Sequence, residues 1–201
     1  MKTYWSIPHK IDRDLPIYAF NKLDGSNIRA EWCRKTGFSK FGTKQRLLSE
    51  EEKPFGEAIS IFRRDWEESL VKIFKEQRYE KVVVFFEFFG PNSFAGNHVE
   101  EEHELVLIDV APYKKGILPP QEFLKLFGHL NVPKVLYQGK AGVEFEEKVK
   151  SGQVEGLTFE GVVCKGLRKK QLRMFKIKNR AWLDRLRDYC KGDEKLFNEL
   201  S

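Results

Sequence analysis

Six short segments rich in β-branched and aromatic residues constrain the fold of this 201-residue chain more than any other feature of its sequence. The segments come in unequal groups, with helical patterns between some of them and not between others. A doubly wound parallel sheet needs strict alternation of strands and helices, so the pattern predicts an α+β fold with antiparallel sheets. The predicted strands are 17–23, 27–33, 82–89, 105–110, 159–164 and 172–178.

Apolar residues that recur every three to four positions predict four helices. The first follows Gly56, is roughly 20 residues long, and carries an apolar stripe. The stripe consists of Ile59, Phe62, Trp66, Leu70 and Ile73. The others are a short helix opened by Pro119 and Pro120, a helix over 143–150, and one over 181–189 with Leu183 and Leu186 inward. No linker-like stretch divides the chain, so residues 1–201 are predicted to form one domain.

The composition excludes several classes of protein. Apolar residues make up 41% of the chain, enough for a core. No apolar run reaches the roughly 18 residues of a membrane-spanning helix. The first residues lack the apolar stretch of a secretory signal, so a cytoplasmic location without a membrane partner is predicted. Cys33, Cys164 and Cys190 are odd in number and far apart, which argues against a disulfide framework or a thiolate zinc site.

Positive charge gathers in the last quarter of the chain. The sequence has 36 Lys and Arg against 30 Asp and Glu, a formal net charge of +6. Between Lys165 and Arg187 the sequence holds many basic residues and a single acidic residue, Asp184. This distribution predicts an anion-binding surface there and favours a polyanionic partner such as nucleic acid.

Four segments place ionisable groups beside small or strand-forming residues. They are 22–27 (Lys-Leu-Asp-Gly-Ser-Asn), 86–90 (Phe-Glu-Phe-Phe-Gly), 160–165 (Glu-Gly-Val-Val-Cys-Lys) and 176–178 (Lys-Ile-Lys). Taken singly, each has an ordinary structural explanation: Asp-Gly favours turns, and lysines are usually solvated. Lys176 and Lys178 would share one face of a strand, with Phe175 and Ile177 facing the core. Glu87, in an apolar strand, needs a hydrogen-bonding partner.

Together and in this order, the four segments resemble motifs I, III, IV and V of the covalent nucleotidyltransferases, the superfamily of polynucleotide ligases and mRNA capping enzymes. Segment 22–27, the phrase over 86–96 and Asp109 most resemble RNA ligases of the bacteriophage type. The resemblance implies a nucleotidyltransferase (adenylation) domain with antiparallel sheets flanked by helices. It also implies ATP-dependent joining of RNA 5′-phosphate and 3′-hydroxyl ends through a covalent lysine–AMP.

The resemblance assigns the catalytic roles to Lys22, Lys176 and Lys178. Lys22 would attack the α-phosphorus of ATP. A free lysine, with a pKa of about 10.4, is neutral in only about 1 molecule in 2,500 at pH 7, so its pKa has to be lowered. Lys176, Lys178 and a bound Mg²⁺, with Mn²⁺ as an alternative, supply the positive charge. Glu160 is the implied metal ligand, because Mg²⁺ prefers carboxylate oxygen.

The resemblance also implies a nucleotide-binding set. Its members are Asn21, Asp24, Asn27, Lys44, Glu87, Ile108, Glu160, Val163 and Lys165. Asn27 and Glu87 would contact the sugar and phosphate region, and the backbone near Asn21 would meet the adenine edge. Ile108, where the family often has an aromatic residue, and Val163 would form the walls of the base pocket. The basic residue after motif I is Lys44 or Arg46, with Lys44 favoured and Arg29 a weaker candidate.

Alternative functions remain in view. Only 23 residues follow Lys178, too few for the OB-fold domain of DNA ligases and capping enzymes, so no such domain is expected. A non-catalytic module that binds nucleic-acid ends would have no use for Glu160. The expected partners are RNA ends, with DNA as an alternative, and a monomer is favoured. His98 and His103 are predicted to lie in a solvated acidic loop, not a zinc site, and Trp182 to pack, not to stack on a base.

Overall fold

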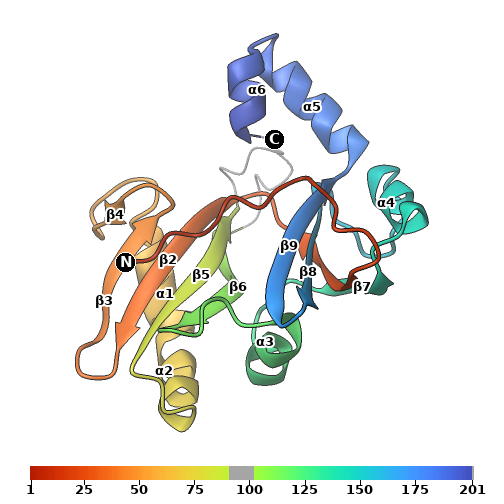
Figure 1. The fold of residues 1–201 in the computed structure, drawn as a ribbon. Coiled ribbons are helices and arrows are strands. Elements are labelled where there is room, and N and C mark those ends of the chain that lie inside the picture. Colours follow the sequence, from red (N-terminus) through yellow and green to blue (C-terminus); the bar gives the residue numbers. More distant parts are fainter. Residues whose placement is uncertain (91–101, 201) are drawn as a thin grey trace. The chain divides into compact units, whose positions relative to one another are not determined.

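The computed structural model describes residues 1–90 and 102–200 (Figure 1). The chain divides into two compact units: unit 1 is Met1–Ser6 with Gly25–Val132, and unit 2 is Ile7–Asp24 with Pro133–Ser201. Each unit contains one sheet, and every strand pair in both sheets is antiparallel. The predicted α+β class with antiparallel sheets is therefore confirmed, while a single domain over 1–201 stays a prediction.

Unit 1 contains a five-stranded sheet with the order β4-β3-β2-β5-β6. Its strands are β2 (Ser26–Cys33), β3 (Gly37–Thr43), β4 (Leu47–Leu48), β5 (Lys81–Phe89) and β6 (Glu104–Pro112). Its helices are α1 (Glu57–Asp65), α2 (Glu67–Glu76) and α3 (Pro120–Phe127).

The helices of unit 1 pack on one face of this sheet because side chains alternate along its strands. Phe86 of β5 meets Phe62 and Trp66, with ring centroids 5.6 and 4.8 Å apart, and Trp32 of β2 meets Phe74 at 5.3 Å. These edge-on and tilted aromatic contacts form the core of the unit. The intervening residues of β2 and β5, which include Asn27 and Glu87, therefore point to the opposite face.

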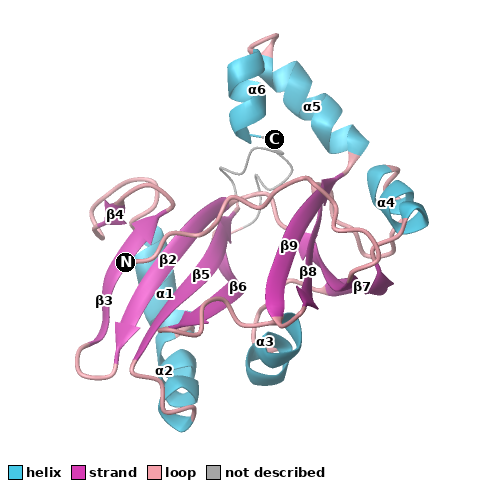
Figure 2. Ribbon diagram, in the orientation of Figure 1, coloured by secondary structure: helices cyan, strands magenta, loops and turns pink. Residues whose placement is uncertain are grey.

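Unit 2 contains a four-stranded sheet with the order β7-β1-β8-β9. Its strands β8 and β9 lie side by side in Figure 2. Its strands are β1 (Pro16–Lys22), β7 (Val135–Lys140), β8 (Gly161–Arg168) and β9 (Gln171–Lys178). Its helices are α4 (Val143–Lys150), α5 (Arg180–Cys190) and α6 (Glu194–Leu200). Strand β1, from the start of the chain, lies between two strands that follow it by more than a hundred residues.

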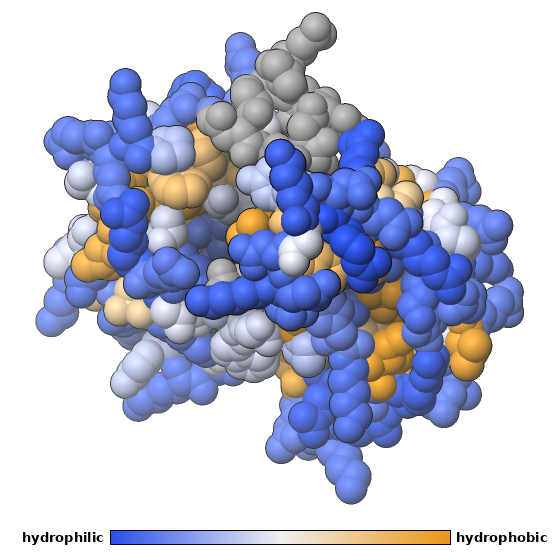
Figure 3. Space-filling view, turned by 90° about the horizontal axis from the view of Figure 1, so that it is seen from above, coloured by the Kyte–Doolittle hydropathy of each residue, from blue (hydrophilic) through white to orange (hydrophobic). Residues whose placement is uncertain are grey.

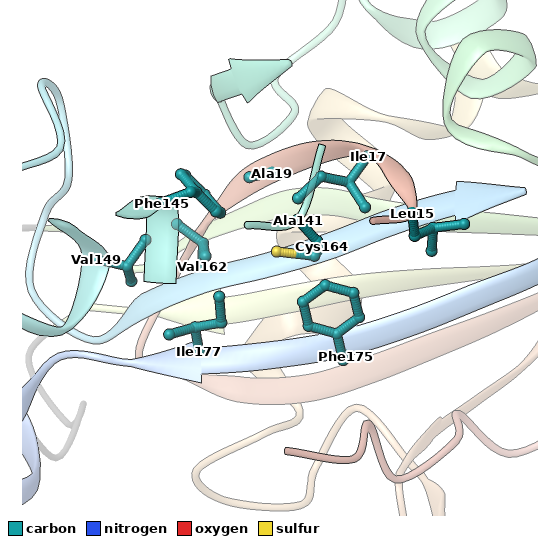
Figure 4. Close-up of a cluster of buried hydrophobic side chains, with 10 residues drawn as sticks. All are labelled: Leu15, Ile17, Ala19, Ala141, Phe145, Val149, Val162, Cys164, Phe175 and Ile177. Atoms are coloured by element: carbon teal, nitrogen blue, oxygen red, sulfur yellow. The ribbon is translucent and has the colours of Figure 1, made fainter. Parts of the chain in front are cut away.

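The core of unit 2 lies between one face of its sheet and α4 (Figure 4). Phe175 and Ile177 of β9 are both buried in it, as the alternation predicted. The cluster consists of Leu15, Ile17, Ala19, Ala141, Phe145, Val149, Val162, Cys164, Phe175 and Ile177. All three cysteines of the chain are free thiols, and Cys164 is fully buried in this cluster. Since the apolar face is filled, charged residues of the same strands gather on the other face.

The structure corrects three of the predicted elements. The helix after Gly56 is two helices, broken at Trp66, whose backbone angles of −122° and −36° leave the helical range. The strand predicted over 159–164 begins at Gly161 and runs on to Arg168. Gly161 has a φ of +139°, which breaks regular extended structure and leaves Glu160 outside the strand. Leu183 is only half-buried; Trp182, Leu186 and Cys190 form the buried side of α5.

The surface carries hydrophilic side chains over most of the face in Figure 3, with smaller apolar areas between them. Exposed large apolar residues are scattered over both units, among them Tyr113 and Tyr189. Within residues 1–90 and 102–200, each helix is too short or too polar to cross a bilayer.

Candidate active site

The register of the four-stranded sheet brings two predicted catalytic lysines to the same point. Gly161 of β8 pairs with Lys22 of β1 on one side and with Lys178 of β9 on the other. Gly161 has no side chain, and a Cβ there would lie 2.1 Å from the carbonyl oxygen of Ile177. The lysines therefore flank a position that only glycine fits.

Glu160, the residue before this glycine, joins the two lysines. Lys22 Nζ donates to Glu160 Oε2 at 2.8 Å, and Lys178 Nζ donates to Glu160 Oε1. The Glu160 and Lys178 side chains are almost fully buried, and Lys22 retains 22% exposure. A carboxylate thus accepts one ammonium group on each oxygen, which is the charge-assisted type of hydrogen bond. We call Lys22, Glu160 and Lys178 the lysine–glutamate cluster.

Burial and the neighbouring opposite charges shift the pKa values of Glu160 and Lys178 in opposite directions. Burial alone raises the pKa of Glu160, but Lys22 and Lys178 outweigh it, and the pKa falls below its ordinary value. Burial lowers the pKa of Lys178, and the nearby Lys22 lowers it further, although Glu160 opposes both. The cluster therefore holds an ionised carboxylate and an ammonium group whose positive charge is disfavoured.

Three other predicted residues of unit 2 lie on one face of its sheet. Lys176, Val163 and Lys165 alternate with the core residues of their strands and so lie on the face of the lysine–glutamate cluster. Lys165 is buried, with its ammonium 4.9 Å from the centre of the Phe20 ring. This face therefore combines cations with aromatic and aliphatic surface.

Asn21 and Asp24 lie beside Lys22 in the chain. The backbone N–H of Asn21 donates to the Lys134 carbonyl at 2.8 Å, and its side-chain oxygen accepts from the backbone and hydroxyl of Thr158. These bonds fix the end of β1 at the point where Lys22 leaves the sheet. Asp24 favours the charged form of Lys178.

In unit 1, Asn27 and Glu87 pair directly across β2 and β5. Glu87 Oε1 accepts from the backbone N–H of Gly25 at 3.1 Å, which supplies the partner that the sequence required. Asn27 donates to the Phe86 carbonyl at 3.3 Å, and its side-chain oxygen is buried with no hydrogen-bond partner within the described part of the chain. A buried orphan acceptor of this kind is unusual and fits a donor from a ligand.

No sequence pattern pointed to Tyr4, which lies on the same face of the unit 1 sheet as Asn27 and Glu87. Its ring is 4.9 Å from that of Phe85, and its hydroxyl donates to the fully buried Asp109. Burial raises the pKa of Tyr4, and Asp109 adds to the effect. Ile108, the predicted base wall, is half-buried at an irregularity in the pairing of β5 and β6.

The three basic candidates after motif I differ in exposure and in their partners. Lys44 is exposed just past the end of β3, and Arg46 pairs with Glu52. Arg29 is buried in β2, donates to the Met1 carbonyl at 3.3 Å, and keeps an Nε without a hydrogen-bond partner among the described residues. The choice of Lys44 stays a prediction.

The histidines of the acidic segment are partly described. His98 and the phrase over 91–96 lie outside the described residues. The solvated position predicted for His103 is wrong: its side chain is only 14% exposed, its ring is tilted by 35° against Phe88 with centroids 4.7 Å apart, and its Nδ1 lies 2.8 Å from Glu57.

A metal site built from protein ligands alone is absent from residues 1–90 and 102–200, where no group of three His, Cys, Asp or Glu side chains could hold an ion. Glu160 accepts one ammonium on each oxygen, and each carboxylate oxygen has a second lone pair. One carboxylate fits a divalent ion that keeps several waters and takes substrate phosphate oxygens.

Comparison with known proteins gives matches among solved structures alone. No protein-family model matches this chain, and no curated protein does. A variant of Naegleria gruberi RNA ligase with arginine replaced by alanine, solved with ATP and Mn, aligns with a TM-score of 0.67 at 18% identity over 88% of this chain and 53% of that one. The same ligase with PPi aligns at 0.63 and 19%, over the same shares of the two chains. A lysine-to-alanine variant with ATP and Mn aligns at 0.64 and 16%, over 86% and 52%.

These likenesses show the fold. The mixed fold with antiparallel sheets matches the structures of RNA ligases, and the chain spans about half the length of those it matches. The similarity agrees with the RNA-ligase resemblance and does not extend to its bacteriophage subdivision.

Proposed function

We propose that this chain is the nucleotidyltransferase part of an ATP-dependent RNA ligase and that Lys22 carries AMP. One observation carries the proposal: strand β1 and the distant hairpin of β8 and β9 bring Lys22, Glu160 and Lys178 into a single hydrogen-bonded group. A protein that only needs a basic surface has no use for a carboxylate buried between two lysines. The ATP and Mn of the neighbouring ligase structures support the choice of nucleotide.

In the proposed reaction, Lys22 Nζ attacks the α-phosphorus of ATP. A phosphorus–nitrogen bond forms, the bond to the β-phosphate oxygen breaks, and pyrophosphate leaves. The amine has to lose its proton first, to water at the partly exposed Lys22 side chain, and Lys178 promotes this loss because it disfavours a second positive charge nearby. Lys176 and Lys178 then stabilise the negative charge on the phosphoryl oxygens.

Glu160 would hold a divalent ion, Mg²⁺ or Mn²⁺, together with the phosphates of ATP. When bound, the ion supplies positive charge to the phosphates and to the departing pyrophosphate. The same carboxylate fixes the Lys22 ammonium in the absence of substrate. The chain thus keeps its nucleophile at the site in both states.

The nucleotide contacts of Asn27, Lys44, Glu87 and Ile108, with those of Asn21, Asp24, Val163 and Lys165, remain part of the proposal through the resemblance. Among them, Asn27 has direct support from its buried acceptor without a partner. The RNA substrate with 5′-phosphate and 3′-hydroxyl ends, the bacteriophage type, the monomeric state and the cytoplasmic location are likewise proposals.

The test is covalent labelling. Incubation with ATP and Mg²⁺ is expected to add the mass of AMP to the intact protein, and peptide mapping is expected to place it on Lys22. Lys22→Arg keeps the positive charge beside Glu160 but lacks the nucleophile, so it should fold normally and take no label. Exposed Lys169, replaced by alanine, is the matched control and should label as the wild type does.

The outcomes separate the alternatives. Label from GTP in place of ATP would indicate a capping-type enzyme. A wild-type protein that binds RNA ends and takes no label from ATP, GTP or NAD would exclude the catalytic proposal. A panel of 5′-phosphorylated RNA and DNA ends then tests sealing, which is a separate step from labelling.

A further inference from the structure

The start of helix α5 places an indole ring directly over one lysine of the cluster. Lys178 is the last residue of β9, Asn179 caps the helix by accepting from the N–H of Ala181 at 2.8 Å, and α5 begins at Arg180. Side chains of a helix lean toward its N-terminus. Trp182, in the first turn, is therefore directed back onto Lys178, whose Nζ lies 3.7 Å from the centre of the ring.

All three side chains at this contact are buried. Trp182 is 2% exposed, and the Lys178 and Glu160 side chains are 3% and 4% exposed. The Lys178 ammonium thus has the Glu160 carboxylate as one neighbour and the face of an indole as another. An ammonium over a tryptophan face is attracted by the ring quadrupole, and the attraction is strongest where water is excluded.

Two further contacts tie α5 and its N-cap residue to the residues just before β8. The N–H of Asn179 donates to the Glu160 carbonyl at 2.9 Å. One turn beyond Trp182, the Arg185 guanidinium lies 4.9 Å from the centre of the Phe159 ring. These contacts hold the start of the helix next to Glu160.

We propose that Trp182 is a positioning residue of the adenylylation site, where its indole face holds the Lys178 ammonium against Glu160. This inference rests on the proposed function for its catalytic consequence. Trp182 acts through Lys178, whose ammonium lies over its ring. Its position in the first turn of α5 directs the ring onto Lys178. An aliphatic side chain there could fill space but would not attract the ammonium group.

The contact itself can be measured without activity. Protons above an aromatic ring resonate upfield, so the ε-methylene signals of Lys178, assigned by their loss in Lys178→Arg, are expected upfield of the other lysines. Trp182→Leu should return them to the ordinary lysine position, and Trp182→Phe should retain part of the shift. Leu186→Ala, a buried change one turn further along α5, is the control and should leave the shift in place.

The catalytic consequence is measured as the single-turnover rate of enzyme–AMP formation at saturating ATP. Trp182→Leu is expected to slow it roughly tenfold to thirtyfold, as the loss of one desolvated cation–π contact implies. Trp182→Phe should slow this rate less than Trp182→Leu. Because it changes the side-chain volume less, it keeps the test valid if the leucine variant does not fold. In a Lys178→Met background, Trp182→Leu should have no further effect.

Three results would overturn the proposal: an ordinary chemical shift for Lys178 in the wild type, a folded Trp182→Leu protein with the wild-type rate, or full additivity with Lys178→Met. If the wild type takes no label at all, the proposed function fails. The chemical shifts then still decide whether the ring holds Lys178.

Discussion

At the scale of single residues, Glu160 has the most demanding position in unit 2. Placing a carboxylate in a nearly dry environment is costly, and its two ammonium partners offset that cost. Since an apolar residue of the same volume could give the protein similar stability, stability does not explain why a buried carboxylate stands at position 160. The proposed reaction gives the carboxylate a use, since it would hold the divalent ion beside Lys22.

Replacing Glu160 by glutamine tests this balance. The variant leaves Lys178 buried without the Glu160 carboxylate. We therefore expect the free energy of unfolding, measured with urea at pH 7, to fall by about 3 kcal/mol. Glu144→Gln removes an exposed partner of Lys148 on α4 and should leave the free energy of unfolding nearly unchanged. An equal effect of the two substitutions would contradict the buried arrangement.

The same comparison has a defined pH dependence. The folded-state pKa of Glu160 is lowered, so its contribution to stability is present above the unfolded-state value of 4.5 and is lost as the pH falls through the folded value. The difference between wild type and Glu160→Gln should therefore shrink on acidification below that point. A difference that stayed constant down to the lowest accessible pH would mean that the carboxylate is not held ionised by the lysines.

At the scale of elements, the pairing of β1, β8 and β9 depends on Gly161. Its φ of +139° is strained for any residue with a side chain, and a Cβ would collide with the Ile177 carbonyl. Because this residue lies opposite both Lys22 and Lys178, a shift of β8 would move both lysines relative to Glu160. Here one glycine determines the geometry of the site.

Gly161→Ala is expected to destabilise the protein by about 3 kcal/mol or more, because backbone strain is joined by a steric collision. Gly192→Ala is the matched control in the same unit: its φ is +90°, and nothing lies within 4 Å of the added Cβ, so about 1 to 2 kcal/mol is expected. Thermal unfolding monitored by circular dichroism measures both. Similar losses for the two variants would show that β8 can relax around the added methyl group.

At the scale of the whole molecule, unit 2 is assembled from both ends of the chain. Its second strand in spatial order, β1, comes from residues before the Gly25–Val132 segment of unit 1, while β7, β8 and β9 come from residues after that segment. Without β1, the sheet falls into an isolated strand and the hairpin of β8 and β9. A two-stranded hairpin is at best marginally stable in water.

The fragment 133–201 is therefore expected to be unfolded when made alone, with a poorly dispersed amide NMR spectrum. A peptide of residues 7–24 should restore dispersion, since it returns β1 and the core residues Leu15, Ile17 and Ala19. A peptide with Ile17→Asp is the control and should not restore it, because the charge would enter the core. A well-dispersed spectrum of 133–201 alone would contradict the dependence on β1.

Local patterns predicted some features well and others poorly. The apolar stripe from Ile59 to Ile73 is buried as predicted, but the break at Trp66 leaves no trace in hydrophobic spacing. Strand β7 was missed because an edge strand with mostly exposed residues has no alternating pattern. Trp182 was correctly expected to pack, yet its contact with Lys178 depends on where α5 begins.

The sequence by itself determined the antiparallel α+β class, the alternation along β9 and the four segments that hold the ionisable groups, because these follow from local periodicity and spacing. Only the tertiary structure decided that Lys22 and Lys178 share Glu160, since that depends on the register of strands more than 130 residues apart. Register is set by packing and by Gly161, through contacts between segments that no local pattern encodes.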